Sequence, residues 1–241
     1  MRFTAVALFL LFFCGCADKS AVSAPDEDDF EAEFSSVEEF DPLSGYNRVM
    51  TEFNDAAFRN VIIPTADGYR KVVPQGARVS INNFFDNLAF PVRFVNNILQ
   101  GKITNAASET GRFIINTTVG FLGFANTADE LYGMQKHDED FGQTLGVWGI
   151  PSGPHIVLPI LGPSNLRDLG GMAVNYITPL TYNSWNVFEN NWQSIGVGAF
   201  GAFNGLSDFA PMYEAMTKDA IDLYPLMKNM YEQRRDKLIK E

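Results

Sequence analysis

The sequence predicts an all-α domain that carries one irregular hairpin and no sheet. Apolar residues recur every three or four positions along most of the chain after residue 41, which is the period of an amphipathic helix. Prolines and glycines crowd residues 149–163, where no regular helix can form. Three parts are expected: a signal peptide at 1–15, a lipidated cysteine with an acidic tether at 16–40, and a single helical domain at 41–241.

The first expected helix begins at Asp41-Pro42, an N-cap residue followed by proline in the first turn. Its apolar stripe consists of Leu43, Tyr46, Met50, Phe53, Ala57 and Val61. A second helix carries an apolar stripe from Phe84 to Leu99, a kink at Pro91, and an asparagine-rich opposite side. That side suits lipid head groups or a narrow wet path; asparagine turn chemistry around the kink is the alternative.

The remaining elements follow from breakers and caps. A third helix is expected from Ile103 to about Thr118, and a short one within 138–148. Residues 149–163 predict a rigid, mostly extended hairpin, after which Ser164 and Asn165 restart helix. The last long helix carries an apolar stripe from Phe209 to Met230, and Pro225 is expected to kink or divide it.

The amino terminus has the pattern of a bacterial lipoprotein signal. Arg2 precedes an apolar run, Phe3 to Phe13, that is too short to span a bilayer. Gly15 supplies the small residue needed before a lipidated cysteine, which indicates Cys16 as the lipid anchor; a plain signal peptide with incidental cysteines is the alternative. Ala17, where Asp would indicate retention in the inner membrane, favours the outer membrane.

Charge and composition narrow the classes of partner. The net charge of −11 is concentrated at residues 17–40, which hold nine acidic residues and one lysine. Such a run indicates a solvated tether, and the absence of a basic patch excludes nucleic-acid binding. The 21 phenylalanines indicate apolar surface that faces lipid, with an ordinary aromatic-rich core as the alternative.

The sequence offers no catalytic or cofactor motif. The two histidines, His137 and His155, stand in no paired metal-ligand spacing, and an acidic turn is favoured over a metal site at His137. The strings of a G-x-S-x-G nucleophile elbow and of a Walker A loop are missing. The string G-x-G-x-x-G at Gly196 follows no strand, so close helix packing by Gly201 and Gly205 is the preferred interpretation. We therefore expect no enzyme, no cofactor and no metal.

Ordered blocks from Asp41 to Asp168 resemble the MlaA family, also called VacJ, of outer-membrane lipoproteins. The blocks are Asp41-Pro42-Leu43, Gly45-Tyr46-Asn47-Arg48, Phe53-Asn54-Asp55, Asn83-Phe84-Phe85, Asn87-Leu88, Pro91, Leu99-Gln100-Gly101-Lys102, Arg112-Phe113, Asn116-Thr117-Thr118-Val119-Gly120, Glu139-Asp140-Phe141-Gly142-Gln143-Thr144-Leu145-Gly146, Trp148-Gly149, Gly153-Pro154, Leu158-Pro159, Leu161-Gly162-Pro163-Ser164 and Arg167-Asp168. His155 departs from the family's usual tyrosine, and the likeness is loose beyond about residue 180.

The resemblance implies a ring of amphipathic helices that lies in the membrane plane, within the periplasmic leaflet of the outer membrane, around an amphipathic channel bordered by a flexible hairpin. It further implies that the protein associates with a trimeric porin, takes misplaced phospholipid from the outer leaflet and passes it to a soluble periplasmic carrier.

The resemblance and the hairpin pattern together indicate the candidate site residues. The expected gate consists of Trp148, Pro151, Pro154, Leu158, Pro159 and Pro163. Phe53, Arg167 and Asp168 are expected to line the ring or channel, with helix capping and a local ion pair as the alternative for Arg167 and Asp168. Two rival functions stay open: a structural or adhesive lipoprotein without transport, and a phospholipid hydrolase, against which the scarcity of histidine argues.

Overall fold

The computed structural model describes residues 41–177 and 191–241, within one compact unit, Asp41–Glu241. The predicted signal peptide, Cys16 and the acidic tether lie outside the described residues. The helices, in chain order, are α1 (Ser44–Ala57), the π-helix η2 (Phe58–Ile62), α2 (Ile63–Val72), α3 (Gln75–Leu88), α4 (Phe90–Leu99), α5 (Ile103–Thr118), α6 (Thr127–Tyr132), α7 (Phe141–Val147), α8 (Leu166–Ile177), α9 (Asn191–Thr217) and α10 (Leu223–Lys240). The strands are β1 (His155–Leu158) and β2 (Gly162–Asn165).

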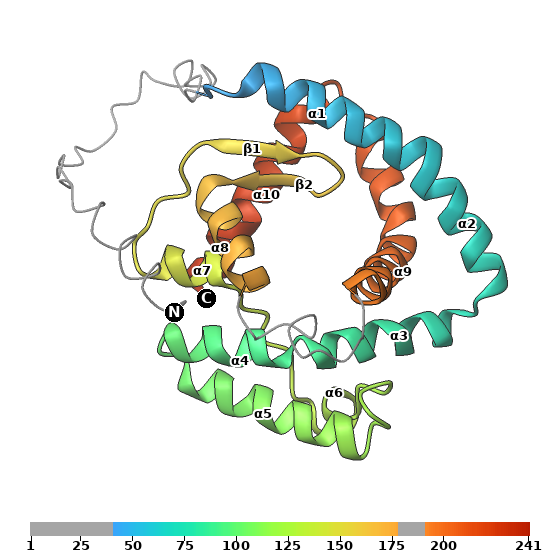
Figure 1. The fold of residues 1–241 in the computed structure, drawn as a ribbon, viewed down its shortest axis with the longest axis vertical. Helices are drawn as coiled ribbons and strands as arrows, with labels where there is room; N and C mark the ends of the chain where they lie inside the picture. Colours follow the sequence, from blue (N-terminus) through green and yellow to red (C-terminus); the bar gives the residue numbers. More distant parts are fainter. Residues whose placement is uncertain (1–40, 178–190) are drawn as a thin grey trace, which may run out of the picture. The chain divides into compact units, whose positions relative to one another are not determined.

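Contacts between successive elements close a ring within this unit (Figure 1). α1 continues through η2 into α2, and Pro74, which restricts Val73 to an extended conformation, turns the chain into α3. α3 contacts α4, α4 contacts α7, α7 contacts α10, and α10 returns to α1. α9 packs against α2 and α3, while α5 and α6 lie on the side of α4 that faces away from the hairpin.

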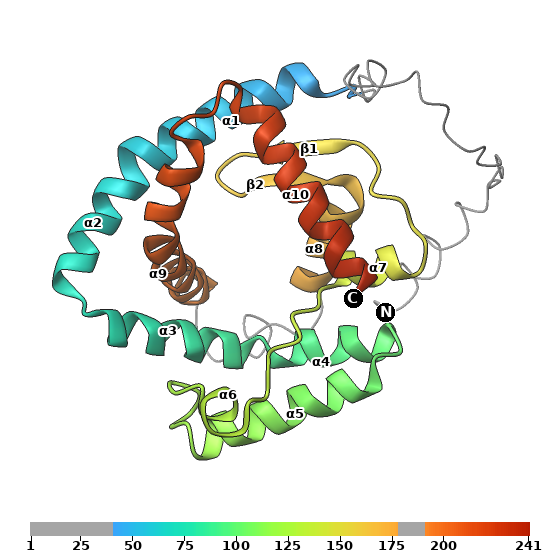
Figure 2. The same cartoon turned by 180° about the vertical axis from the view of Figure 1, so that it is seen from behind.

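The hairpin β1–β2 lies on the inner side of α1, and α10 crosses in front of the hairpin in the view of Figure 2. The prediction of no sheet is wrong here, because residues 155–158 pair with 162–165 as a two-stranded antiparallel sheet. Proline is compatible with these strands for a local reason. Pro163 stands opposite Val157, and the N–H of Val157 bonds to the side chain of Asn47 on α1.

Two predicted helices are each divided in the structure; the sequence predicted a kink at Pro91 and a kink or a division at Pro225. The chain breaks at Ala89 between α3 and α4, so Pro91 falls in the first turn of α4, where its missing N–H costs nothing. The expected last helix is two helices, since α9 ends at Thr217 and α10 begins after the N-cap Asp222. Pro225 again lies in a first turn rather than at a break.

The start of α1 also differs from the prediction. The helix begins at Ser44, and the Asp41 carboxylate accepts a hydrogen bond from the Tyr224 hydroxyl on α10 instead of capping the helix. The third helix and the short helix within 138–148 are confirmed as α5 and α7, the latter capped by Asp140, whose carboxylate accepts the N–H of Gln143 at 2.9 Å.

The apolar core is small. Ile63 and Ala66 on α2 pack against Ala210 on α9, with the Phe58 and Tyr213 rings 4.2 Å apart beside them. Gly201 on α9 lies against the ring of Phe85, where a Cβ would stand 2.7 Å from Cε2, so the helix-packing interpretation of this glycine is confirmed. Across residues 41–177 and 191–241, the longest apolar helical stretches fall short of what a membrane crossing requires.

Candidate functional site

The side chains of the described residues reverse the usual distribution of polarity. Most fully buried side chains are polar or charged: Asn47, Asn96, Asn97, Glu109, Thr144, Asn165, Asn204 and Ser207 are the largest of them. Many large apolar side chains are exposed, among them Val72, Val119, Phe121, Leu131, Ile160, Leu161 and Trp192. The predicted apolar stripe is exposed at Tyr46 and Phe53 on α1 and at Val61 on η2, whereas Asn47 and Thr51 on α1 are buried. Apolar side chains gain nothing from exposure to water, so this surface suits a lipid environment.

The base of the hairpin is held by side chains of α1 and α10. Asn47 donates from Nδ2 to the carbonyl of His155 at 3.0 Å, and its Oδ1 accepts the N–H of Val157 at 2.8 Å. The His155 ring is buried, with Nδ1 2.8 Å from Oε1 of Glu232 on α10. His155 therefore joins the hairpin to α10.

The predicted gate residues lie on and before this hairpin. Trp148 ends α7 half-exposed, and its Nε1 donates to the carbonyl of Leu99 at 3.1 Å, which ties the approach to the hairpin to α4. Pro151 and Pro154 are exposed on the segment that leads into β1. Leu158 and Pro163 are half-buried in the strands, and Pro159 is exposed in the turn between them. The structure thus places these residues along one continuous segment.

Arg167 and Asp168 lie where the hairpin enters α8, and both are buried. The side chain of Asn165 accepts the N–H of Asp168 at 2.8 Å, and Arg167 Nε donates to Asp168 Oδ1 at 3.0 Å. A helix cap at the Asp168 N–H and a local ion pair between Arg167 and Asp168, the alternative expected for these two residues, are therefore both present. Phe53 lies apart from them, half-exposed on α1.

Arg235 on α10 connects α7 and α8 through two carboxylates. Its Nη1 donates to Asp140 Oδ2 at 2.6 Å and its Nη2 to Asp168 Oδ1 at 2.9 Å, while the Tyr231 hydroxyl donates to Asp168 Oδ2 at 2.6 Å. Burial raises the pKa of Asp140 and of Asp168, but the hydrogen bonds and charge of Arg235 outweigh it and hold both pKa values below the usual range. Burial and the contact with Asp168 raise the pKa of Tyr231.

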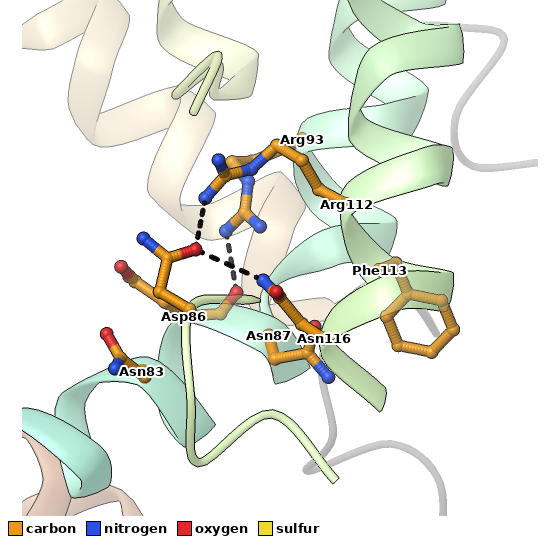
Figure 3. A pocket seen from close by; sticks show the side chains of 8 residues that line it. Asn83, Asp86, Asn87, Arg93, Arg112, Phe113 and Asn116 are labelled. Atoms are coloured by element: carbon orange, nitrogen blue, oxygen red, sulfur yellow. Dashed lines mark hydrogen bonds between the residues drawn. The ribbon is translucent and has the colours of Figure 1, made fainter. Parts of the chain in front are cut away.

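A second polar cluster lies between α3, α4, α5 and α6 (Figure 3). Glu109, fully buried, accepts Arg93 Nε at 2.6 Å and the N–H of His137 at 2.8 Å, and lies 3.6 Å from Arg112 Nε. Arg112 also donates to Asn126 Oδ1 at 3.2 Å. Arg93, Arg112 and Asn126 are among the residues that border a cavity of about 20 Å³, enough for roughly one water molecule.

Sequence reasoning missed the residues that support the hairpin and the ring. Asn47 and Asn54 were named only within the family-like blocks and not as site residues. Glu109 and Arg235 were not named at all. Each of the four acts on a partner far away in the chain or on another helix. The one local signal was the seven-residue spacing of Asn47 and Asn54, which puts both amides on one face of α1. Within residues 41–177 and 191–241, no group of three histidine, cysteine or acidic side chains is arranged to hold a metal ion.

Comparison with known proteins identifies the family. The family model described as MlaA lipoprotein matches residues 39–238. The chain is 31% identical over 242 residues to the intermembrane phospholipid transport system lipoprotein MlaA of Escherichia coli, covering 98% of this chain and 88% of that protein. An uncharacterised protein of Rickettsia typhi is 30% identical over 83% of this chain and 78% of its own length.

A solved structure gives the same answer at the level of the fold. The structure described as the structural basis for maintenance of bacterial outer membrane lipid asymmetry superposes with a TM-score of 0.72 at 30% identity, covering 83% of this chain and 100% of the other. The sequence and the fold of this chain therefore both match that structure. The protein belongs to the MlaA lipoprotein family.

Proposed function

We propose that this protein is an outer-membrane lipoprotein, anchored through Cys16, that removes misplaced phospholipid from the outer leaflet and so maintains lipid asymmetry. As a member of the MlaA lipoprotein family it is a transport lipoprotein and not an enzyme. The proposal rests mainly on the reversed polarity of the ring: asparagine, arginine and glutamate side chains are buried, and large apolar side chains are exposed.

The energetics of lipid movement explain why such a ring suits this task. Each acyl methylene exposed to water costs about 0.8 kcal/mol, so a phospholipid leaving a leaflet needs an apolar surface for its tails and a polar one for its head group. In the proposal the ring lies in the periplasmic leaflet with its apolar side chains in lipid, and the head group passes along an amphipathic channel beside the hairpin. The residues Trp148, Pro151, Pro154, Leu158, Pro159 and Pro163 form its gate.

The proposal extends to partners at family level. The E. coli relative is named as a lipoprotein of an intermembrane phospholipid transport system, which supports retrograde transport by this chain as well. A trimeric porin beside the ring and a soluble periplasmic carrier that accepts the lipid complete the proposed system. Phe53, Arg167 and Asp168 are assigned to the ring wall, Phe53 against lipid and the ion pair in support of the hairpin.

The decisive measurement is the amount of phospholipid in the outer leaflet of cells that lack the protein. Loss should raise it, and the wild type should restore it. A Pro154→Ala, Pro159→Ala variant should restore it less, because both prolines stiffen the proposed gate. Pro64→Ala is the matched control, since Pro64 is also exposed but lies in the first turn of α2, away from the hairpin.

The outcomes separate the proposal from its rival. Membrane fractions must contain equal amounts of each variant for the comparison to count. An unchanged outer leaflet in cells without the protein would contradict transport and favour a structural lipoprotein. Restoration by the hairpin variant equal to that by Pro64→Ala would remove the gate assignment while leaving transport in place.

A further inference from the structure

Two buried arginines, Arg93 on α4 and Arg112 on α5, share a single carboxylate. Their side chains are 6% and 8% exposed, and that of Glu109 is fully buried. Arg93 Nε donates to Glu109 Oε2 at 2.6 Å, whereas Arg112 Nε lies 3.6 Å from Glu109 Oε1, too far for a hydrogen bond. Among residues 41–177 and 191–241, no other carboxylate pairs with either guanidinium. The cluster therefore holds one surplus positive charge away from bulk water.

The surplus charge borders the cavity of about 20 Å³ between α3, α4 and α5 (Figure 3). Arg112 Nε is buried there and, within the part of the chain that the structure describes, has no hydrogen-bond partner. Asn83, Asn87 and Asn116 also line the cavity, and each uses its amide nitrogen for one hydrogen bond to the protein. Because an amide nitrogen carries two hydrogens, each of these three side chains has one N–H to spare. The wall of the cavity is therefore rich in donors.

Asp86 lines the same cavity, but its charge is already balanced. Its carboxylate lies 3.2 Å from Nζ of Lys136, and its side chain is 54% exposed. Solvent screens such an exposed pair, so it adds little potential of either sign to the buried cluster. One negative charge is therefore still missing beside Arg112.

We propose that this cavity binds one small monovalent anion of the size of chloride, which balances the charge of Arg93, Arg112 and Glu109. A buried charge without a counter-charge is strongly destabilising, and an anion in the cavity supplies that counter-charge. A space for roughly one water molecule admits chloride, which is only slightly larger, and is too small for a phosphate or a lipid head group.

The bound anion joins three helices. Its donors come from α3 through Asn83 and Asn87, from α4 through Arg93, and from α5 through Arg112 and Asn116. The anion thus fastens the outer helix α5 to the ring. This site goes beyond the proposed transport function, and none of the measurements below depends on lipid transport.

Thermal unfolding of the purified full chain in an uncharged detergent, at constant ionic strength, tests the proposal. Sodium gluconate is the reference salt, because gluconate is far too large for the cavity. Sodium chloride or sodium bromide in its place should raise the Tm by about 2–4 °C, since an anion that binds only the folded state stabilises it. Equal Tm values in the three salts would overturn the proposal and leave a buried water molecule as the occupant.

Asn87→Asp tests whether the cavity is the site of the effect. Aspartate has nearly the shape of asparagine, and the Thr117 hydroxyl, 2.9 Å from Asn87 Nδ2, can turn to donate to the new carboxylate. The carboxylate supplies the missing charge, so the Tm of this variant should be the same in chloride as in gluconate. An undiminished chloride effect in Asn87→Asp would place the anion elsewhere and overturn the proposal.

Asn60→Asp is the matched control, because it makes the same change of charge at an exposed position. Asn60 lies in η2, where its Nδ2 donates only to the carbonyl of Ala56. This variant should keep the full chloride effect. Loss of the effect in Asn60→Asp as well would show that net charge, and not the cavity, sets the response to salt.

Crystals of the full chain grown in sodium bromide locate the anion without any variant. The anomalous difference map should show a peak in the cavity within hydrogen-bond distance of Arg112 Nε. Density for a water molecule at that position, with no anomalous peak, would overturn the proposal even if chloride raised the Tm.

Discussion

Gly171 on α8 lies so close to Gly142 on α7 that a Cβ built at Gly171 would stand 2.5 Å from the backbone nitrogen of Gly142. No side chain larger than hydrogen fits between the two helices at this point. α7 carries the approach to the hairpin and α8 leaves it, so the contact fixes the distance between the two ends of the hairpin segment.

We expect Gly171→Ala to lower the free energy of unfolding by about 1–3 kcal/mol, because the added methyl group must force the backbones apart. Gly170→Ala is the matched control, since a Cβ at Gly170 meets nothing within 4 Å. That variant should be stabilised by up to about 1 kcal/mol, the helix-propensity difference between glycine and alanine. Urea unfolding in detergent, followed by circular dichroism, measures both. Equal effects of the two variants would show that the close contact does not constrain the fold.

The contacts of Arg235 with Asp140 and Asp168 predict that the stability of the fold is sensitive to acid. The pKa values of Asp140 and Asp168 are depressed in the folded protein, so their pairing stabilises it above the unfolded value, about pH 4, and is lost as the pH falls through the folded values. In Arg235→Gln, Asp140 loses its cation and Asp168 keeps only Arg167, which raises both pKa values. The midpoint of acid unfolding should therefore move to higher pH, and stability at pH 7 should fall by about 2–3 kcal/mol.

Arg234→Gln controls for the loss of positive charge from α10, because Arg234 is the exposed neighbour on the same helix. Its acid midpoint should equal that of the wild type. An Arg235→Gln midpoint that stays with the control would mean that the two carboxylates gain nothing from the guanidinium.

The bounds of the helices could be predicted from the sequence better than which side of each helix faces the protein. The bounds predicted for α5 agree with those observed, because an apolar stripe of helical period between helix-breaking residues defines a helix locally. The stripe on α1 was equally clear, yet periodicity does not say which side faces protein, and here the asparagines face inward. The pairing of Asn47 and Asn54 with β1 joins residues more than 100 positions apart, beyond the reach of any local pattern.

Prolines that lie in the first turn of a helix were wrongly interpreted from the sequence. Pro91 was expected to kink a helix and Pro225 to kink or divide one, but each lies just inside the start of a new helix. The actual breaks, at Ala89 and after Thr217, carry no strong local signal. The position of such breaks depends on the long-range packing of α9 on α2 and of α10 on α7.

Glu109 is expected to be the most costly single charge to remove. It is fully buried with Arg93 at 2.6 Å, so Glu109→Gln leaves a buried cation uncompensated and should lower the free energy of unfolding by about 3–5 kcal/mol. Removing both charges in Arg93→Gln, Glu109→Gln should cost less than the sum of the two single variants. Additive losses, or a loss no larger than that of the exposed control Glu130→Gln, would contradict the pairing.

Trp148 offers a direct test of whether the gate region meets lipid. It is 51% exposed at the end of α7, and tryptophan at such a position favours the membrane–water interface. With Trp185→Phe and Trp192→Phe it becomes the sole tryptophan of the chain, so its fluorescence can be followed in vesicles. We expect phospholipid brominated on its acyl chains to quench it by about half or more, because the indole lies beside the acyl region while its Nε1 remains bonded to Leu99. Vesicles without bromine give the reference intensity. Strong quenching by aqueous iodide with none by brominated lipid would place Trp148 in water and remove it from the lipid path.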